Sequence, residues 1–236
     1  MFNTTGEYTR LEYFTENVAA DTRRKEFDIK NHSLIHTKKR PDFLFIGDSI
    51  TQYWELNAYF HTSNSLLINR GIAGDTTTYL KKRFFVDALQ LQPKYCILGI
   101  GINDSIDLEG DYWKQLNPKP YDIVLSTAQK NISDIVQQSK SSITCLILTS
   151  LLPFSVPVFL HEQDRKKYVT EMNIWLKSFA KDNNLIFVDY YSAIIKNYTD
   201  DAIHLITYDG LHPNALGYEI MADTLKNTLY KNNIHI

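Results

Sequence analysis

The side chains that could carry out chemistry lie in four short polar clusters that are far apart in the sequence. The clusters occupy residues 47–51, 69–76, 101–104 and 209–213. The first contains Ser49, and the last contains His212 three residues after Asp209. A serine hydroxyl is a poor nucleophile until an imidazole can take its proton, and a carboxylate can hold that imidazole in the right tautomer. If the fold brings these side chains together, they could perform acyl transfer through an activated serine.

Each cluster also has an ordinary structural interpretation. The Gly-Asp-Ser sequence at 47–49 can be a strand-to-helix turn in which a side chain caps the next helix. The glycine-containing second cluster can be a turn before another helix, and Pro213 is typical of a helix start. Taken singly, the structural interpretation of each cluster is favoured. Taken together, four clusters at four element boundaries would be four coincidences, and the combined pattern indicates a functional site.

The segments between the clusters predict the elements that must position them. Five short apolar runs predict strands at 42–47, 65–69, 94–100, 143–150 and 185–190. Longer segments with helical or helix-compatible spacing lie at 75–90, 121–138, 165–181 and 214–230. The spacing in 121–138 places Ile123 on the same expected buried face as Val124 and Ala128. Apolar strands that alternate with helices predict a parallel sheet covered on both faces, an α/β/α architecture. In such a sheet ligands bind beyond the carboxyl ends of the strands, where the polar clusters stand.

The first forty residues differ from the rest in their mixed charge. We expect residues 1–40 to form a helical amino-terminal extension that packs on the main domain, 41–236, and ends before Pro41. A solvated disordered arm is less favoured, because several apolar side chains there need burial: Leu11, Phe14, Val18, Phe27, Ile29 and Leu34.

Composition excludes several protein classes. The chain has 236 residues, of which 44% are hydrophobic, so it can bury one sizeable core. A formal charge of -2 gives no sign of a nucleic-acid or anionic-membrane partner. No signal peptide or membrane span is evident, which predicts a cytoplasmic protein. Two cysteines, Cys96 and Cys145, rule out a disulfide framework, and both are expected to be buried.

The four clusters resemble the sequence blocks of the SGNH hydrolases, the GDSL esterase/lipase superfamily. The resemblance spans about residues 40–230 and is carried by RPDFLFIGDSITQYW, LLINRGIAGDTT, QPKYCILGIGINDS and DGLHPNALGYEIMADTL. It is closest to the catalytic subunits of intracellular platelet-activating-factor acetylhydrolase and their bacterial relatives. The resemblance implies a flavodoxin-like three-layer sandwich with a five-stranded parallel sheet. Ile50 stands where GDSL has leucine, a conservative change. Phe154 stands where relatives often have arginine, so the resemblance does not assign the acyl or alcohol specificity.

The same resemblance assigns roles to single residues. It makes Ser49 the nucleophile, His212 the base and Asp209 the group that orients the base. It also makes Gly74, Asn103 and the backbone N–H of Ser49 the donors of an oxyanion hole. An amide or backbone N–H at these positions would stabilise charge that develops on the ester oxygen.

Two other functions use similar residues. The carboxylates Asp48, Asp75 and Asp104, with His212, superficially resemble the dinuclear site of a metal-dependent phosphoesterase. Such sites usually need several histidines near the carboxylates, and the first three clusters contain none. A catalytically silent relative used for binding would normally have lost a reactive side chain, and none is missing. We therefore expect a metal-independent serine esterase without a cofactor, in which Asp48 and Asp75 brace loops and cap helices.

The expected substrate is a small-molecule ester with an acetyl or other short acyl group. Aromatic residues near the clusters are candidates for contacting it: Tyr53, Trp54, Trp113 and Phe154. A pocket lined by aromatic side chains suits an O-acetylated carbohydrate and a short-chain lipid ester about equally. A homodimer is a candidate assembly, with neither nucleic acid nor a membrane span expected.

Overall fold

The five apolar runs form one parallel sheet in the computed structural model, which describes residues 8–14, 18–60, 65–110, 116–157 and 159–236. The strands are β1 (Phe43–Gly47), β2 (Leu67–Gly71), β3 (Tyr95–Gly99), β4 (Cys145–Thr149) and β5 (Ile186–Val188). They lie in the order β2-β1-β3-β4-β5, with every neighbouring pair parallel. This is the flavodoxin-like order, in which the chain reverses direction across the sheet between β1 and β3.

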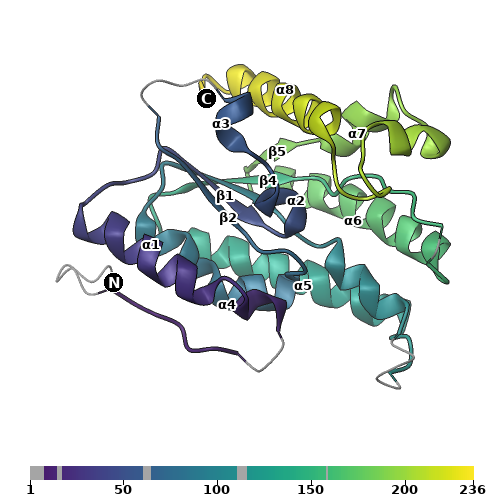
Figure 1. The fold of residues 1–236 in the computed structure, drawn as a ribbon, viewed down its shortest axis with the longest axis horizontal. Coiled ribbons are helices and arrows are strands. Elements are labelled where there is room, and N and C mark those ends of the chain that lie inside the picture. Colours follow the sequence, from purple (N-terminus) through teal and green to yellow (C-terminus); the bar gives the residue numbers. More distant parts are fainter. Residues whose placement is uncertain (1–7, 15–17, 61–64, 111–115, 158) are drawn as a thin grey trace.

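Helices cover both faces of the sheet, so the predicted three-layer sandwich is confirmed (Figure 1). One face carries α4 (Thr77–Asp87), α5 (Tyr121–Ser139) and α6 (Glu162–Asp182), with α1 (Arg24–His36) beside α4. The other face carries α3 (Leu56–Tyr59), α7 (Tyr190–Ile195) and α8 (Ala215–Lys231). Short 3-10 turns lie at Ala19–Asp21, Leu89–Leu91, Asn103–Leu108 and Asp200–Leu205. Within the described ranges no helix is long and apolar enough to cross a membrane.

Alternation along β1 explains how one strand joins two cores. Leu44 and Ile46 pack with the α4–α5–α6 layer, whereas Phe43 and Phe45 pack with the α3–α7–α8 layer. All five residues of the strand are buried, as its apolar run predicts. The sheet is therefore a rigid platform whose carboxyl edge can present loops at fixed positions.

Three expectations about single side chains are wrong. Ile29 is 62% exposed on α1, and Ile123 is 56% exposed in the first turn of α5. Cys145 is exposed at the first position of β4, whereas Cys96 is fully buried in β3. Each of the three exposed residues lies at an element end or on an outward helix face, where the sheet and its layers provide no cover.

Three glycines end three neighbouring strands side by side. Gly47 of β1 is in register with Gly71 of β2 and with Gly99 of β3. A Cβ on Gly71 would stand 2.2 Å from the backbone nitrogen of Gln52, and one on Gly47 would stand 2.1 Å from the Gly99 carbonyl oxygen. The missing side chains let α2 (Ser49–Gln52) lie directly against the carboxyl edge of the sheet.

Replacing these glycines should have unequal effects. Gly71→Ala places a methyl group against the backbone of α2, and α2 cannot shift without breaking its hydrogen bonds. The substitution should therefore lower the free energy of unfolding by about 1–3 kcal/mol. Gly99→Ala is the matched control, because its Cβ would meet only the Thr149 hydroxyl, at 2.9 Å. Urea denaturation of both variants measures the difference. Equal stability of the two variants would contradict the proposed close packing of α2.

Candidate active site

Ser49, His212 and Asp209 lie in one hydrogen-bonded chain, although 163 residues separate the serine from the histidine. The distance from Ser49 Oγ to His212 Nε2 is 2.9 Å, and that from His212 Nδ1 to Asp209 Oδ2 is 2.6 Å. Ser49 is the first residue of α2, directly beyond β1, and the other two lie in the loop before α8. The three side chains thus meet at the carboxyl edge of the sheet.

The loop that carries His212 is held in a tight turn by Asp209. Its Oδ1 accepts hydrogen bonds from the backbone N–H groups of Leu211, at 3.0 Å, and His212, at 2.8 Å. Gly210, the residue after Asp209, has a φ of +86°, and a Cβ there would stand 1.9 Å from the Ser155 carbonyl oxygen. The turn therefore needs a glycine at this position, and it leaves Oδ2 of Asp209 beside the imidazole.

The hydrogen bonds of Asp209 also control its charge. Partial burial by itself raises the pKa of the carboxyl, but hydrogen bonds from the His212 backbone N–H and imidazole outweigh it and hold the pKa below its ordinary value. Asp209 is therefore an anion at neutral pH and accepts the Nδ1–H of His212. In that tautomer Nε2 is free to accept the proton of the Ser49 hydroxyl.

The carboxylates that accompany the clusters hold helices and loops. Asp48 caps α2 by accepting the Ile50 N–H at 3.0 Å, as expected from the sequence. Asp75 forms a 2.7 Å ion pair with Arg83 and so braces its loop. The side-chain cap of α4 comes instead from Asp104, which accepts the Thr77 N–H at 3.0 Å. Within the described part of the chain, no three His, Cys, Asp or Glu side chains group as a metal site.

Gly74 and Asn103 lie in two loops that are tied to each other. Asn103 Nδ2 donates a hydrogen bond of 2.9 Å to the backbone oxygen of Asp75, the residue after Gly74. Gly74 has a φ of +78°, and its N–H makes no hydrogen bond to another residue of the described ranges. Asn103 thus has one amide hydrogen left to donate, and the Gly74 N–H has no acceptor among the described residues.

The aromatic residues expected at the pocket fall into three groups. Tyr53 is 54% exposed, and its ring lies edge-on to the His212 ring at 5.6 Å. Trp54 and Phe154 are only 4% and 1% exposed, and a contact of either residue with the substrate stays a prediction. Trp54 stacks on Tyr218 in the α8 layer, and Phe154 packs beside Phe159 and the guanidinium of Arg165. Trp113 lies outside the described residues.

Sequence reasoning missed residues that support the site. The Tyr218 hydroxyl donates to the Ile50 carbonyl at 2.8 Å, and Gln52 Oε1 accepts the Ala73 N–H at 2.7 Å. Gln52 belongs to the same sequence block as Ser49, so its position was a usable signal. Tyr208 is 78% exposed, and its N–H donates to the carbonyl of His212. No pattern in the sequence separates Tyr208 from other surface tyrosines.

Comparison with known proteins gives a consistent result. The sequence profile of the GDSL-like lipase/acylhydrolase family matches residues 45–220, a range that includes all four clusters. An acetylxylan esterase of Geobacillus stearothermophilus is 25% identical over 209 residues, which cover 76% of this chain and 89% of that protein. The crystal structure of a GDSL-like lipase from Bacteroides thetaiotaomicron superposes with a TM-score of 0.71 at 26% identity, covering 91% of this chain and all of that one. A structure of an acetylxylan esterase from Geobacillus stearothermophilus superposes with a TM-score of 0.62 at 22% identity, covering 79% of this chain and 93% of that one, and shows the shared fold.

The buried carboxyl of Asp48 should make stability depend on pH. Burial, together with the nearby carboxylates Asp75 and Asp104, raises the pKa of Asp48 from 3.8 to about 7. The folded protein therefore binds this proton more tightly than the unfolded chain does, and the free energy of unfolding falls as pH rises from about 4 to about 7. Asp48→Asn keeps the capping oxygen and removes this contribution, which is on the order of 3–4 kcal/mol across that range.

Urea denaturation at several pH values measures the effect of the Asp48→Asn substitution. The difference in unfolding free energy between variant and wild type should grow in favour of the variant through this pH window. Asp223→Asn is the matched control, because the Asp223 side chain is 66% exposed on α8. Parallel pH profiles for wild type and Asp48→Asn would show that the Asp48 carboxyl is not perturbed by burial.

Proposed function

Because this chain belongs to the GDSL-like lipase/acylhydrolase family and is a carboxylic ester hydrolase, we propose that it cleaves small acyl esters through a covalent acyl-enzyme on Ser49. The observation that carries the proposal is the chain of two hydrogen bonds from Ser49 through His212 to Asp209. Such a chain couples attack by the hydroxyl to removal of its proton. No metal or cofactor takes part in the proposed reaction.

The reaction proceeds in two acyl transfers. His212 Nε2 takes the proton of Ser49 as Oγ attacks the ester carbonyl carbon, and the imidazolium returns a proton to the departing alcohol. A water molecule then gives a proton to His212 and attacks the acyl-enzyme, which releases the acid and restores the serine. Asp209 stays ionised throughout and stabilises the imidazolium that forms in each step.

The oxyanion of each tetrahedral intermediate is proposed to bind three donors: the N–H groups of Ser49 and Gly74 and the side-chain amide of Asn103. Support comes from the N–H of Gly74, which has no partner in the part of the chain that the structure describes, and from the hydrogen bond that holds Asn103 to the Asp75 carbonyl. Donors that are already in place stabilise developing charge without reorganising during the reaction.

The acyl group is proposed to be acetyl or another short chain. A curated relative that is 25% identical is an acetylxylan esterase, which makes an acetyl ester the first substrate to test. The exposed ring of Tyr53, with Tyr208 on the histidine loop, offers aromatic surface on which a sugar ring or an alkyl alcohol could pack. Both an O-acetylated carbohydrate and a short-chain lipid ester fit this description of the alcohol.

Hydrolysis of p-nitrophenyl esters tests the function. Wild type should cleave p-nitrophenyl acetate, and kcat/KM should fall from acetate to butyrate to octanoate. Ser49→Ala and His212→Ala should each lose nearly all of this activity, and the double variant should be scarcely worse, because members of one catalytic unit are strongly non-additive. Acetylated xylo-oligosaccharides and lysophospholipids in the same panel identify the alcohol.

Circular dichroism of the Ser49→Ala variant serves as the folding control for these assays. Substantial turnover by folded Ser49→Ala would show that the nucleophile is a different group. Faster hydrolysis of octanoate than of acetate would contradict the short acyl group while leaving the serine mechanism intact.

Asn103→Ala tests the oxyanion hole. Since its amide is proposed to bind charge that exists only in the transition state, kcat should fall by about 10²–10³ with KM little changed. Thermal unfolding is measured in parallel, because Asn103 also ties two loops together. A stable Asn103→Ala protein with undiminished kcat would remove Asn103 from the oxyanion hole. A joint loss of stability, KM and kcat would indicate that the side chain only holds the loop.

A further inference from the structure

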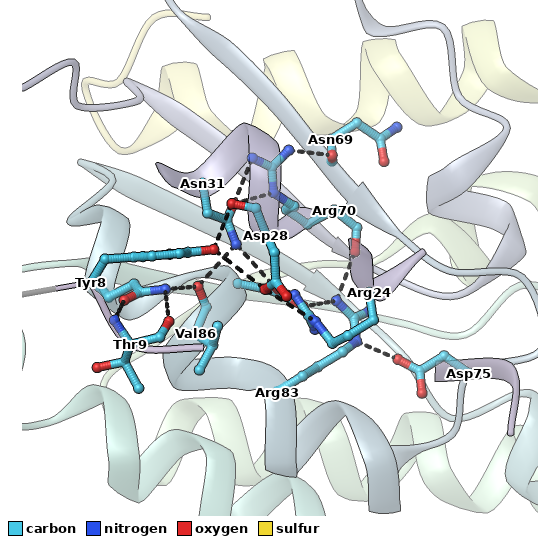
Figure 2. A network of polar contacts seen from close by, with 12 residues as sticks. Tyr8, Thr9, Arg24, Asp28, Asn31, Asn69, Arg70, Asp75, Arg83 and Val86 are labelled. Atoms are coloured by element: carbon cyan, nitrogen blue, oxygen red, sulfur yellow. Dashed lines mark hydrogen bonds and ion pairs between the residues drawn. The ribbon is translucent and has the colours of Figure 1, made fainter. Parts of the chain in front are cut away.

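A fully buried guanidinium, that of Arg83 on α4, lies at the centre of a polar network beside the candidate site (Figure 2). Its Nε donates to Asp75 Oδ2 at 2.7 Å. Its Nη2 donates to the carbonyl oxygen of Gly47 at 3.0 Å, and its Nη1 donates to that of Arg70, also at 3.0 Å. One planar group thus holds the ends of β1 and β2 and the loop that follows β2.

Two of these contacts lead directly to the proposed reaction centre. Gly47 is two residues before Ser49, at the end of the strand that presents the nucleophile. Asp75 follows Gly74, and the backbone carbonyl of Asp75 accepts the hydrogen bond of Asn103 Nδ2 at 2.9 Å. Arg83 is therefore connected through one residue, Asp75, to both donor loops of the proposed oxyanion hole.

The far side of the network is supplied by the amino-terminal extension. Arg83 Nη1 also contacts Asp87 Oδ2 at 3.2 Å, and Asp87 is paired with Arg24 of α1 through Nη1 at 2.7 Å. Burial raises the pKa of Asp87, but the hydrogen bond from Arg24 and the charge of Arg83 outweigh it and keep the pKa below its ordinary value. Asn31 of α1 donates to Asp87 at 3.0 Å. These contacts keep Asp87 ionised, whereas Arg83 reaches Asp75, Gly47 and Arg70 through hydrogen bonds that do not involve α1.

The same helix also reaches the end of β2. Asn31 Oδ1 accepts two hydrogen bonds from the Arg70 guanidinium, at 2.9 and 2.7 Å, and Arg23 Nη1 donates to the Gly71 carbonyl at 2.8 Å. The Cβ of Ala19 lies 3.1 Å from where a Cβ on Gly74 would stand. The extension therefore packs against the glycine loop as well as against α4.

We propose that Arg83 is a positioning residue for ester hydrolysis, which acts through Asp75 to hold Gly74 and Asn103 where the oxyanion forms. The inference rests on the serine mechanism proposed above. Lysine could replace the charge but not the flat fork of donors that reaches Asp75, Gly47 and Arg70 at once. A small displacement of the donor loops would weaken binding of the transition state more than binding of the substrate.

The test compares the same conservative change at the two ends of the network. Arg83→Lys should lower kcat for p-nitrophenyl acetate by about 10- to 100-fold, with KM within about twofold of wild type. Arg24→Lys is the matched control, because it keeps a positive charge beside Asp87 and Arg24 contacts neither Asp75 nor Gly47. It should lower the thermal midpoint while leaving kcat within about twofold of wild type. All rates are expressed per site titrated with a fluorophosphonate.

Two further variants separate positioning from folding. Asp75→Asn keeps the size of the side chain, so the protein should fold. Asp75 accepts hydrogen bonds on both oxygens, from Arg83 Nε and from the Thr76 N–H, and an amide has only one acceptor oxygen, so one of the two bonds is lost and kcat should fall as in Arg83→Lys. In a double-mutant cycle, Asn103→Ala should cost much less kcat when Arg83→Lys is already present, because both changes affect the same donor. A purely structural role would leave the two losses multiplicative.

The proposal is overturned by a kcat within about twofold of wild type in folded Arg83→Lys or Asp75→Asn. It is also overturned if Asp75→Asn fails to fold, because the network would then serve folding alone. If Arg83→Lys fails to fold, the kcat of Asp75→Asn decides. Absence of p-nitrophenyl acetate hydrolysis in wild type would contradict the proposed function instead, and Ser49→Ala distinguishes the two failures.

Discussion

Helix α2 can begin at Ser49 because no side chain stands between it and the ends of the central strands. Gly47 and Gly71 are in register there, and a Cβ on either would collide with neighbouring backbone. With the backbones in contact, the Asn69 side chain can bond the Thr51 carbonyl at 2.6 Å, and Tyr218 can bond the Ile50 carbonyl at 2.8 Å. The position of the serine hydroxyl is thus determined by the sheet, and the meeting with His212 depends on that position.

The tight packing at the carboxyl edge of the sheet also buries three carboxyl groups. Asp48, Asp75 and Asp104 are all buried near the same edge, where burial opposes their ionised forms. Burial raises the pKa of Asp104 to about 6 although it accepts two hydrogen bonds from Thr77. Burial also raises the pKa of Asp75, against the opposing charge of the Arg83 guanidinium. Burying these carboxyls lowers the stability of the fold but holds the loops at the carboxyl edge of the sheet in place, as is typical of functional sites. The amino-terminal helix contributes to this balance because it supplies partners to the charged residues behind the loops.

Patterns that depend on neighbouring residues were enough to predict much of this architecture. Each strand lies within or close to its apolar run, and the buried face of α5 follows its helical spacing, except at Ile123 in the first turn. The meeting of Ser49 and His212 could be expected because parallel strands bring their carboxyl ends to one edge. The sequence blocks then added the individual roles, which remain predictions for experiment.

Features that depend on contacts between distant segments could not be predicted in this way. Arg83 occurs in the charged run KKRFF, yet its side chain is fully buried and bonds to β1, to β2, to the loop after β2 and to Asp87 of its own helix. Nor does the sequence show that Trp54 and Phe154 are almost fully buried, because a large apolar side chain near a site can contact a substrate or fill the core beneath it. Exposure of Ile29 depends on which side of α1 meets the domain, and its helical spacing alone does not determine that side.

The central claim is that Ser49 is the nucleophile of a metal-independent hydrolase. Treating the protein with a fluorophosphonate in the presence of EDTA, followed by mass spectrometry of the intact chain and its peptides, tests it most directly. The account predicts a single adduct on the peptide that contains Ser49, formed at the same rate with and without EDTA, and no adduct in the His212→Ala variant. An adduct on another residue, or an esterase activity that EDTA abolishes while Ser49 stays unlabelled, would contradict it.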